Sequence, residues 1–417
     1  MLLSPSNGIY IFDSVKILQL CNKVPYPEKD GGAIAISTFT RGLIQAGHSV
    51  KMLAMNTTKH YVDEKNIPEE FRKSTGLETV KLDNTVNAFS ALVSLLQGKS
   101  YNAARFESTQ YAEKLKSILL KEKFDVIELE GLYLSSYIPL IRQHSSAPVI
   151  MRAHNVEYKI WEGLASEEKN PIKKIYLNIL VKQLQKFEQK AINLCDGIIT
   201  FTRNDLDQLK LMGCNVALAH IPFGIDISKY TPAPPTDKNS LFYIGALDWQ
   251  PNLQGLEWFL KEVWPKVNFA LPDVTLHIAG RNMPSHMKDS KFSNVVFHGE
   301  VEDAYLFMSK YAIMISPLLA GSGVRIKIIE GMALAKPVIT TKVGIEGIEC
   351  NYGKDVIVAN NAEEFVKSVV YCIQNPDFTK QVADDGRNFV QTRHDIQQII
   401  KDLVCFYQER INGKNSN

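Results

Sequence analysis

The chain has 417 residues, more than one compact core usually holds, which indicates two domains of ordinary size. Apolar residues make up 45% and charged residues 22%, the balance of a globular protein, and a formal net charge of +2 gives no electrostatic case for a nucleic-acid partner. The six cysteines are scattered without metal-ligand spacing. We expect them to be small apolar core residues in a reducing compartment.

The first fifteen residues carry neither a basic segment nor a continuous apolar segment, so no signal peptide is expected. Apolar stretches elsewhere fall short of the ~20 residues that a membrane span needs. The sequence therefore predicts a cytoplasmic protein, with peripheral contact at the inner membrane face as an open alternative.

In the first half, short apolar runs alternate with helical patterns, as in parallel sheets built from β-α-β units. The first strand, expected over 16–21, leads to a turn with Gly31 and Gly32 and then to a helix over about 33–46. Further strands are expected at 49–54, 126–129, 149–152 and 197–201.

One long helix is expected over 170–192, and its pattern leaves two interpretations open. A basic amphipathic helix can lie on an anionic membrane, but the same pattern fits an outer helix whose apolar stripe faces the core. The apolar positions are Ile172, Ile175, Tyr176, Ile179, Leu180, Leu184, Phe187 and Ala191; the charged ones are Lys173, Lys174, Lys182, Lys186, Lys190 and Glu188. The apolar stretch 86–96 is either a second contact for a lipid-linked acceptor or an ordinary helix.

The polar, proline-rich stretch 231–240 is the best linker candidate, because the strand–helix alternation restarts after it. Strands are then expected at 241–244, 275–279, 295–297, 312–316, 337–340 and 356–358. The predicted organisation is an N-terminal Rossmann-like domain over 1–230, a second over 241–390, and a C-terminal helix over 391–417 that can pack back on the first domain.

The segment with the most chemical information follows a buried strand in the second half. Gly321 and Gly323 form a turn, and a helix is expected to begin near Val324. Glycines allow close backbone approach to a ligand, and the free amides of a helix N-terminus favour an anion. Arg325 and Lys327 place two cations in the first turn, where the helix dipole disfavours them by a few tenths of a kcal/mol. A diphosphate bound at this end would compensate for both.

Glu330 lies on the same helix, and its carboxylate can accept hydrogen bonds from paired hydroxyls such as those of a ribose. With this residue, GSGVRIKIIEGMALAKPVIT resembles the nucleotide-binding signature of retaining glycosyltransferases of the family 4 (group 1) type. Other segments resemble further parts of the same family, so that the resemblance covers most of residues 16–390: PYPEKDGGA, RAHNVEY, HIPFGIDISKY, FYIGALDWQPNLQGLEWFLKEVWP, VTLHIAGRN and VVFHGEVED.

The resemblance implies an α/β fold of the GT-B type, in which two Rossmann-like parallel-sheet domains face each other across a cleft. It also implies a nucleotide-diphosphate sugar as donor, a glycan, lipid-linked or small-molecule acceptor, and no metal or other cofactor. The implied catalytic residues are His154, Arg325 and Lys327, the two cations binding the diphosphate and the histidine lying near the reacting sugar. The implied donor-binding residues are Glu330 at the ribose, Gly321, Ser322, Gly323 and Val324 in the turn, and Gly280, Arg281, Glu300 and Val301 around the base. The implied acceptor-binding residues are Gly31 and Gly32.

Two departures from the family pattern concern the detailed roles. Ser322 stands where many relatives have a glutamate, and Asp248, Trp249 and Asn252 occupy the region where many carry an arginine and a lysine. The resemblance to the subgroup with GSGxRxKxxE implies that the cations of the turn replace that pair.

Several alternatives stay open at the level of sequence. The two cations could be solvated helix residues, Glu330 could form a salt bridge within its helix, and His154 could be structural. Asp205 and Asp207 fit the DxD pattern of metal-dependent transferases, but their segment has the pattern of an N-capped helix start. Other functions on the same scaffold are a sugar-nucleotide epimerase, a phosphorylase and a non-catalytic sugar-nucleotide-binding protein.

Overall fold

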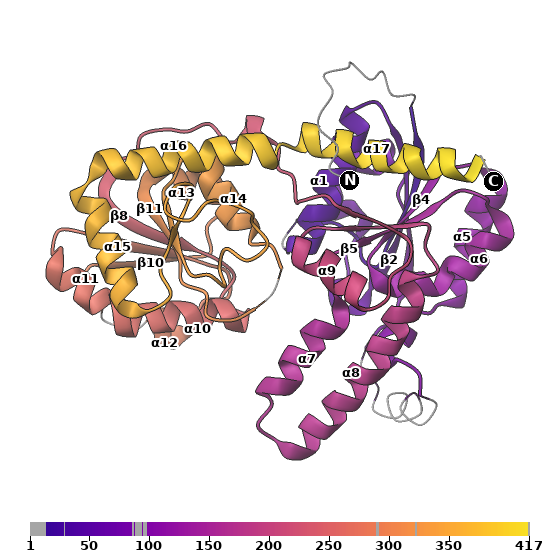
Figure 1. Ribbon diagram of the computed structural model, residues 1–417, viewed down its shortest axis with the longest axis horizontal. Helices are drawn as coiled ribbons and strands as arrows, with labels where there is room; N and C mark the ends of the chain where they lie inside the picture. Colours follow the sequence, from indigo (N-terminus) through magenta and orange to yellow (C-terminus); the bar gives the residue numbers. More distant parts are fainter. Residues whose placement is uncertain are drawn as a thin grey trace.

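The structure, a computed structural model, describes residues 14–415 except 29, 86, 88–93, 95–97, 289–291 and 322. Two parallel β-sheets, each flanked by helices, form two lobes that lie side by side (Figure 1). The predicted α/β architecture with two Rossmann-like domains is confirmed. The stretch 86–96, considered above as an acceptor contact, lies almost entirely outside the described residues.

The N-terminal sheet has seven strands in the order β3-β2-β1-β4-β5-β6-β7. The central strands are buried on both faces, as expected where helices cover a parallel sheet. The strands are β1 (Lys16–Cys21), β2 (Ser49–Thr57), β3 (Glu78–Leu82), β4 (Val126–Glu130), β5 (Val149–Ala153), β6 (Gly197–Thr200) and β7 (Ala217–His220).

The C-terminal sheet has six strands in the order β10-β9-β8-β11-β12-β13. Strand β8 begins at Asp237, because the polar residues after the prolines pair with the neighbouring strands; the stretch without regular structure is therefore 231–236. The strands are β8 (Asp237–Ile244), β9 (Thr275–Ala279), β10 (Val295–Gly299), β11 (Tyr311–Ser316), β12 (Val338–Thr340) and β13 (Ile357–Val358).

Helices connect the strands in both lobes. Those of the first lobe are α1 (Gly31–Gln45), α2 (Glu69–Thr75), α4 (Tyr101–Ala104), α5 (Thr109–Lys121), α6 (Ile138–His144), α7 (Glu157–Glu167), α8 (Pro171–Ile192) and α9 (Arg203–Leu211). Those of the second are α10 (Gln250–Trp258), α11 (Trp264–Ala270), α12 (Ser285–Lys288), α13 (Ala304–Lys310), α14 (Ile326–Ala333), α15 (Ala362–Gln374) and α16 (Pro376–Arg393), and the chain ends with α17 (Ile396–Asn415).

Helices α7 and α8 form a hairpin that projects away from the N-terminal sheet (Figure 1). Asn170 caps α8 by accepting the amides of the first turn, and Pro171 occupies the first helical position. One face of α8 is buried, including Leu180 and Leu184, but Ile172 and Ile175 are 79% and 64% exposed. The expectation of one core-facing stripe is therefore wrong for the first turns, which carry a second, exposed apolar stripe.

Helix α17 returns from the second lobe and lies against the first (Figure 1). Its buried residues include Ile400 and Leu403, and Ile400 packs so closely on α1 that a Cβ on Gly42 would lie 2.8 Å from it. Each fully buried aliphatic side chain contributes about 1.5–3 kcal/mol. One cluster of buried apolar side chains continues through both sheets and α17, so the two lobes share part of their core.

The cysteines are free thiols, and Cys21, Cys195 and Cys372 are buried as expected. The expectation is wrong for Cys405, which is exposed on α17 because its neighbours on the helix take the core-facing positions. Cys214 and Cys350 are partly exposed.

Candidate active site between the two lobes

The glycine turn after β11 leads into α14, whose first residue is Ile326 rather than a residue near Val324. Gly321 and Gly323 have φ values of +107° and +86°, a conformation that side chains other than glycine rarely adopt. Among the described residues no side chain caps this helix, and uncapped amides at a helix N-terminus favour an anion. Ser322 lies outside the described residues.

Arg325 is the N-cap residue of α14 and is buried. Its Nη1 donates to the carbonyl of Gly323 at 2.9 Å, and its guanidinium lies 5.1 Å from the ring centre of Trp249. Burial lowers the pKa of Arg325 to about 10. The side chain is therefore held over an aromatic face beside the turn, with its charge partly removed from water.

Lys327 follows two residues later and lies in a similar setting. Its Nζ donates to Oδ1 of Asn252 at 3.2 Å and lies 4.6 Å from the ring centre of Tyr243. Burial, and then the neighbouring Arg325, lower the pKa of Lys327 to about 7. A Cβ on Gly245, at the end of β8, would lie 3.0 Å from this Nζ, so the glycine keeps space for the ammonium group.

Three of the four residues that depart from the family pattern lie next to cations that the sequence singled out. Trp249 packs under Arg325, and Asn252 accepts from Lys327. Asp248 lies 3.9 Å from Nη2 of Arg281. This region therefore supplies an aromatic ring, an amide oxygen and a carboxylate to cations that other segments contribute.

Glu330 lies one turn further along α14 and faces the segment after β7. Its Oε1 accepts a hydrogen bond from the hydroxyl of Tyr230 at 2.8 Å. Burial raises the pKa of Glu330, and the bond from Tyr230 partly opposes that shift. Both residues line a cavity of about 260 Å³, together with Arg41 and Lys229. No ion pair within the described residues involves Glu330, so the alternative of a salt bridge inside its helix is wrong.

His154 follows β5 directly and faces the glycine turn from the other lobe. It lines a cavity of about 210 Å³ with Gly31, Gly32, Gly323 and Val324. Its Nε2 lies 2.8 Å from Oε2 of Glu130, a buried residue at the end of β4. Five sequence-predicted residues from two lobes therefore surround one cavity.

Gly31 and Gly32 begin α1, where Asp30 accepts the amide of Ala33 and so caps the helix. A Cβ on Gly32 would lie 2.9 Å from Nζ of Lys23, which pairs with Asp30. The glycine therefore leaves room for the Lys23 ammonium group beside the start of α1.

The residues predicted around the base do not join this cavity. A Cβ on Gly280 would lie 2.2 Å from the carbonyl oxygen of Gly245. Gly280 is therefore accounted for by the close approach of these two backbone segments. Arg281 lines a separate cavity of about 270 Å³ with Lys23, and Glu300 is exposed after β10. Val301 packs against the shared apolar core.

Asp205 and Asp207 lie on α9, as the N-cap pattern predicts. Thr202 caps that helix, accepting the amide of Asp205, and Asp207 pairs with Lys210. Over the described part of the chain, no group of three or more His, Cys, Asp and Glu side chains could hold a metal ion. The same part of the chain contains no helix long and apolar enough to cross a bilayer.

Sequence reasoning missed Glu130, Tyr230, Tyr243 and Gly245. A signal was present for Glu130, because the run VIELE places two carboxylates on one side of a buried strand, and buried carboxylates need partners. Tyr230, Tyr243 and Gly245 carry no comparable signal, since their roles depend on which distant segments lie beside them.

In both sheets the strand order reverses between the first and fourth strands, and the cavities lie beyond the carboxyl ends of the strands. This is where open α/β sheets bind ligands. Two such domains, with a glycine turn and cations on one side and a histidine on the other, define a protein of the GT-B class.

Comparison with known families identifies the class more closely. Residues 29–229 match the family model Glycosyltransferase Family 4, and residues 238–375 match Glycosyl transferases group 1. The chain belongs to this family and is a glycosyltransferase.

Relatives and solved structures cover nearly the whole chain. An uncharacterized 44.6 kDa protein in the cps region of Klebsiella pneumoniae is 26% identical, over 93% of this chain and 98% of its own length. Sucrose-phosphate synthase from Thermosynechococcus elongatus has a similar fold, with a TM-score of 0.70 at 15% identity, over 95% of this chain and 100% of that one. HepE from Anabaena, solved in complex with UDP-glucose, has a TM-score of 0.65 at 13% identity, over 95% and 100% of the two chains.

Proposed function

We propose that this glycosyltransferase moves a sugar from a nucleotide-diphosphate donor to an acceptor hydroxyl, with retention of anomeric configuration and without a metal. The observation that carries the proposal is the pair Arg325 and Lys327 at the open start of α14, opposite His154. The retention of configuration rests on the family resemblance alone.

Arg325 and Lys327 would bind the donor diphosphate with the amides of the turn, and Glu330 would accept hydrogen bonds from the ribose hydroxyls. Breaking the bond between the anomeric carbon and the diphosphate oxygen places negative charge on the leaving group. Cations and amides that already point at this charge lower the barrier, and loss of one such donor typically costs about 10²–10³ in rate. The anomeric carbon bonds to the acceptor oxygen, and the hydroxyl proton leaves with the diphosphate.

We further propose that the acceptor, a glycan, a lipid-linked sugar or a small molecule, enters beside Gly31 and Gly32. The free thiols favour a reducing, cytoplasmic location. The exposed lysines and isoleucines of α8 support peripheral contact with an anionic membrane at its inner face.

A thermal-shift panel of UDP-, GDP- and ADP-sugars tests the donor, beginning with UDP-glucose because HepE was solved with it. A donor present at a hundred times its Kd stabilises the protein by about 2.7 kcal/mol. We expect one nucleotide class to raise the melting temperature and to release free nucleoside diphosphate when an acceptor is added.

Release of nucleotide without an acceptor, together with a free epimerised sugar, would instead identify an epimerase. No melting shift and no turnover with any donor would contradict the proposal.

Assays repeated in excess EDTA test metal independence, and we expect unchanged turnover. Activity that is lost in EDTA and restored only by Mg²⁺ or Mn²⁺ would overturn the proposal that the enzyme needs no metal.

A further inference from the structure

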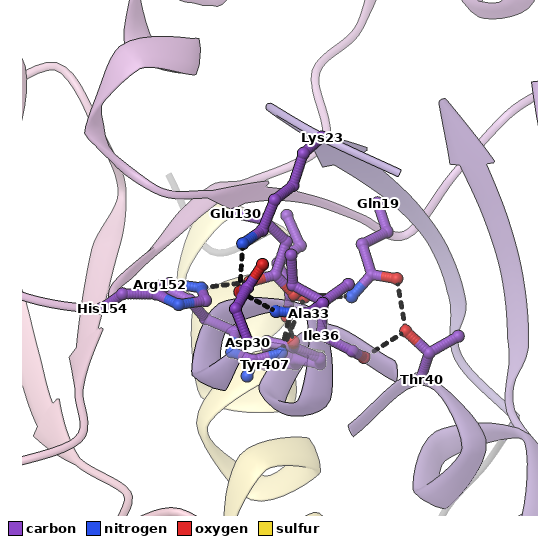
Figure 2. Close-up of polar contacts among 11 residues, drawn as sticks. Gln19, Lys23, Asp30, Ala33, Ile36, Thr40, Glu130, Arg152, His154 and Tyr407 are labelled. Carbon is purple, nitrogen blue, oxygen red and sulfur yellow. Dashed lines mark hydrogen bonds and ion pairs between the residues drawn. The ribbon is translucent and has the colours of Figure 1, made fainter. Parts of the chain in front are cut away.

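A buried network of polar side chains lies directly behind His154, at the end of the N-terminal sheet (Figure 2). Gln19 on β1 donates from Nε2 to Oε1 of Glu130 at 2.7 Å and to Oε1 of Glu128 at 2.9 Å. Nη1 of Arg152 on β5 donates to the same Oε1 of Glu130 at 2.7 Å. The side chains of Glu128, Glu130 and Arg152 have no exposed surface.

The two carboxyl groups of this network have opposite protonation tendencies. Burial raises the pKa of Glu128. Burial would also raise the pKa of Glu130, but Arg152 and the hydrogen bond to His154 outweigh it and hold that pKa well below its usual range. Glu130 therefore carries the charge that balances Arg152, and both of its oxygens act only as acceptors.

This charge state determines which ring nitrogen of His154 holds a proton. Oε2 of Glu130 lies 2.8 Å from Nε2 and has no hydrogen to give, so Nε2 must donate. The ring also contacts Phe201 edge-on at 5.2 Å between centres, which limits its rotation. Nδ1 is then the nitrogen that remains for a ligand, and His154 lines the cavity between the lobes.

We infer that Glu130 is a positioning residue, which fixes His154 as the Nε2–H tautomer so that Nδ1 accepts a hydrogen bond from a sugar hydroxyl in the cavity. The inference rests on the proposed function, because it assumes that a sugar of the donor or of the acceptor enters this cavity. It extends that function by naming the acting nitrogen and the residue that determines it.

The substitution Glu130→Gln tests the inference with nearly unchanged shape. The oxygen of the new amide should stay at the Oε1 position, because Gln19 and Arg152 both donate there. Its NH₂ group then faces His154 and donates to Nε2, which moves the ring proton to Nδ1. The variant should therefore present N–H to the sugar where the wild type presents a lone pair.

The tautomer is read from ¹⁵N chemical shifts of histidine-labelled protein without ligand, with His154→Gln to assign the signals. Spectra are compared at a pH where the same signals show a neutral ring. We expect protonated Nε2 in the wild type and protonated Nδ1 in Glu130→Gln, with kcat lowered at least about ten-fold and donor KM changed much less. Glu128→Gln is the matched control, since Glu128 does not contact His154; it should keep the wild-type tautomer.

Retention of the Nε2–H tautomer in Glu130→Gln would overturn the inference, as would a reversed tautomer with unchanged kcat. If the single variant folds poorly because Arg152 has lost its counter-charge, Glu130→Gln combined with Arg152→Met removes that charge while Gln19 still orients the amide. The tautomer is measured without substrate, so a wild type that transfers no sugar would contradict the proposed function but leave this measurement intact.

Discussion

Lys327 on α14 lies beside Arg325, and no carboxylate contacts Lys327 among the described residues. The carboxylate of Glu346 favours the charged form of Arg325, but burial outweighs it. Burial and mutual repulsion both disfavour the charged lysine in the empty protein. An anionic ligand would remove this disadvantage, whereas a purely structural role would require an acid nearby. The functional and structural interpretations therefore predict opposite effects of removing the charge.

Replacing Arg325 or Lys327 with Met preserves much of the side-chain length and removes the charge. If the cations bind the diphosphate, kcat/KM should fall about a hundred-fold or more, while the melting temperature of the empty protein stays unchanged or rises. Steady-state kinetics and thermal unfolding of both variants measure the two quantities. Lower stability with nearly normal turnover in both would rule out this site.

The lowered pKa of Lys327 also predicts that the protein takes up protons when the donor binds. Its pKa of about 7 in the empty protein should return toward the usual 10.4 when a diphosphate binds, so at pH 8 each bound donor should take up about one proton. Calorimetry in two buffers with different heats of ionisation measures the uptake. The variant Lys327→Met should lose it, and a binding heat independent of buffer in the wild type would contradict the prediction.

The lowered pKa of Lys327 also determines how the free energy of unfolding changes with pH. The lysine pKa is lower in the folded state than in the unfolded state, so the unfolded state binds more protons between about pH 7 and 10. The contribution of Lys327 to stability is therefore least favourable below pH 7 and improves as pH rises through this window.

At the scale of residues, two separate sequence segments singled out the cations and Glu330, and His154, as candidates, but gave no sign of their partners. Tyr230 lies 100 residues from Glu330, and Asn252 lies 75 residues from Lys327. Such contacts depend on the arrangement of the two sheets, which no local pattern encodes.

At the scale of elements, the α7–α8 hairpin shows the limit of helical periodicity. Helix α8 carries apolar residues on two faces, and spacing alone does not indicate which face meets a neighbour. Leu180 and Leu184 pack inward, whereas Ile172, Ile175 and Ile179 face outward among lysines.

We predict that the hairpin binds anionic vesicles weakly and in a salt-sensitive way, with about 1 kcal/mol per lysine near the surface. Ile172→Ser combined with Ile175→Ser should abolish sedimentation with phosphatidylglycerol vesicles at low salt. Leu211→Ser is a matched control, because Leu211 is 81% exposed on α9, outside the hairpin. Equal sedimentation of all three proteins, or none with wild type, would show that the stripe does not bind the membrane.

Most strands were predicted within one or two residues, because buried parallel strands are continuous apolar runs. The exceptions are β2, whose last three residues were missed, and the edge strands β3 and β7, which were not predicted. Their residues are only partly buried, and segments such as ETVKL lack a continuous apolar run. Strand β8 was predicted four residues too short, since its first residues are polar and pair through the backbone.

At the scale of the whole molecule, α17 places the side chain of Tyr407 in the interior of the first lobe. The hydroxyl of Tyr407 donates to Oε2 of Glu128, a residue 279 positions earlier in the chain. The sequence predicted a helix here but gave no sign of this partner, because a single tyrosine on an amphipathic helix has the same pattern whether it is buried or exposed.

The protonation of Glu128 makes this docking dependent on pH. Because burial raises its pKa, the folded protein keeps a proton on Glu128 at pH values where the unfolded chain has lost it. Stability should therefore fall as pH rises from the ordinary carboxyl pKa toward the raised one, and should stop falling above it.

The variant Glu128→Gln holds an uncharged group at every pH and should remove this loss. Relative to wild type, it should be more stable at pH 9 than at pH 5 by about 1 kcal/mol or more, measured by urea unfolding at both values. Tyr407→Phe should instead lower stability by about 1–3 kcal/mol, since it leaves a buried carboxyl oxygen without its donor. Curves for wild type and Glu128→Gln that run parallel from pH 5 to 9 would show that Glu128 does not titrate in this range. In that case the attachment of α17 to the first lobe would not depend on this proton.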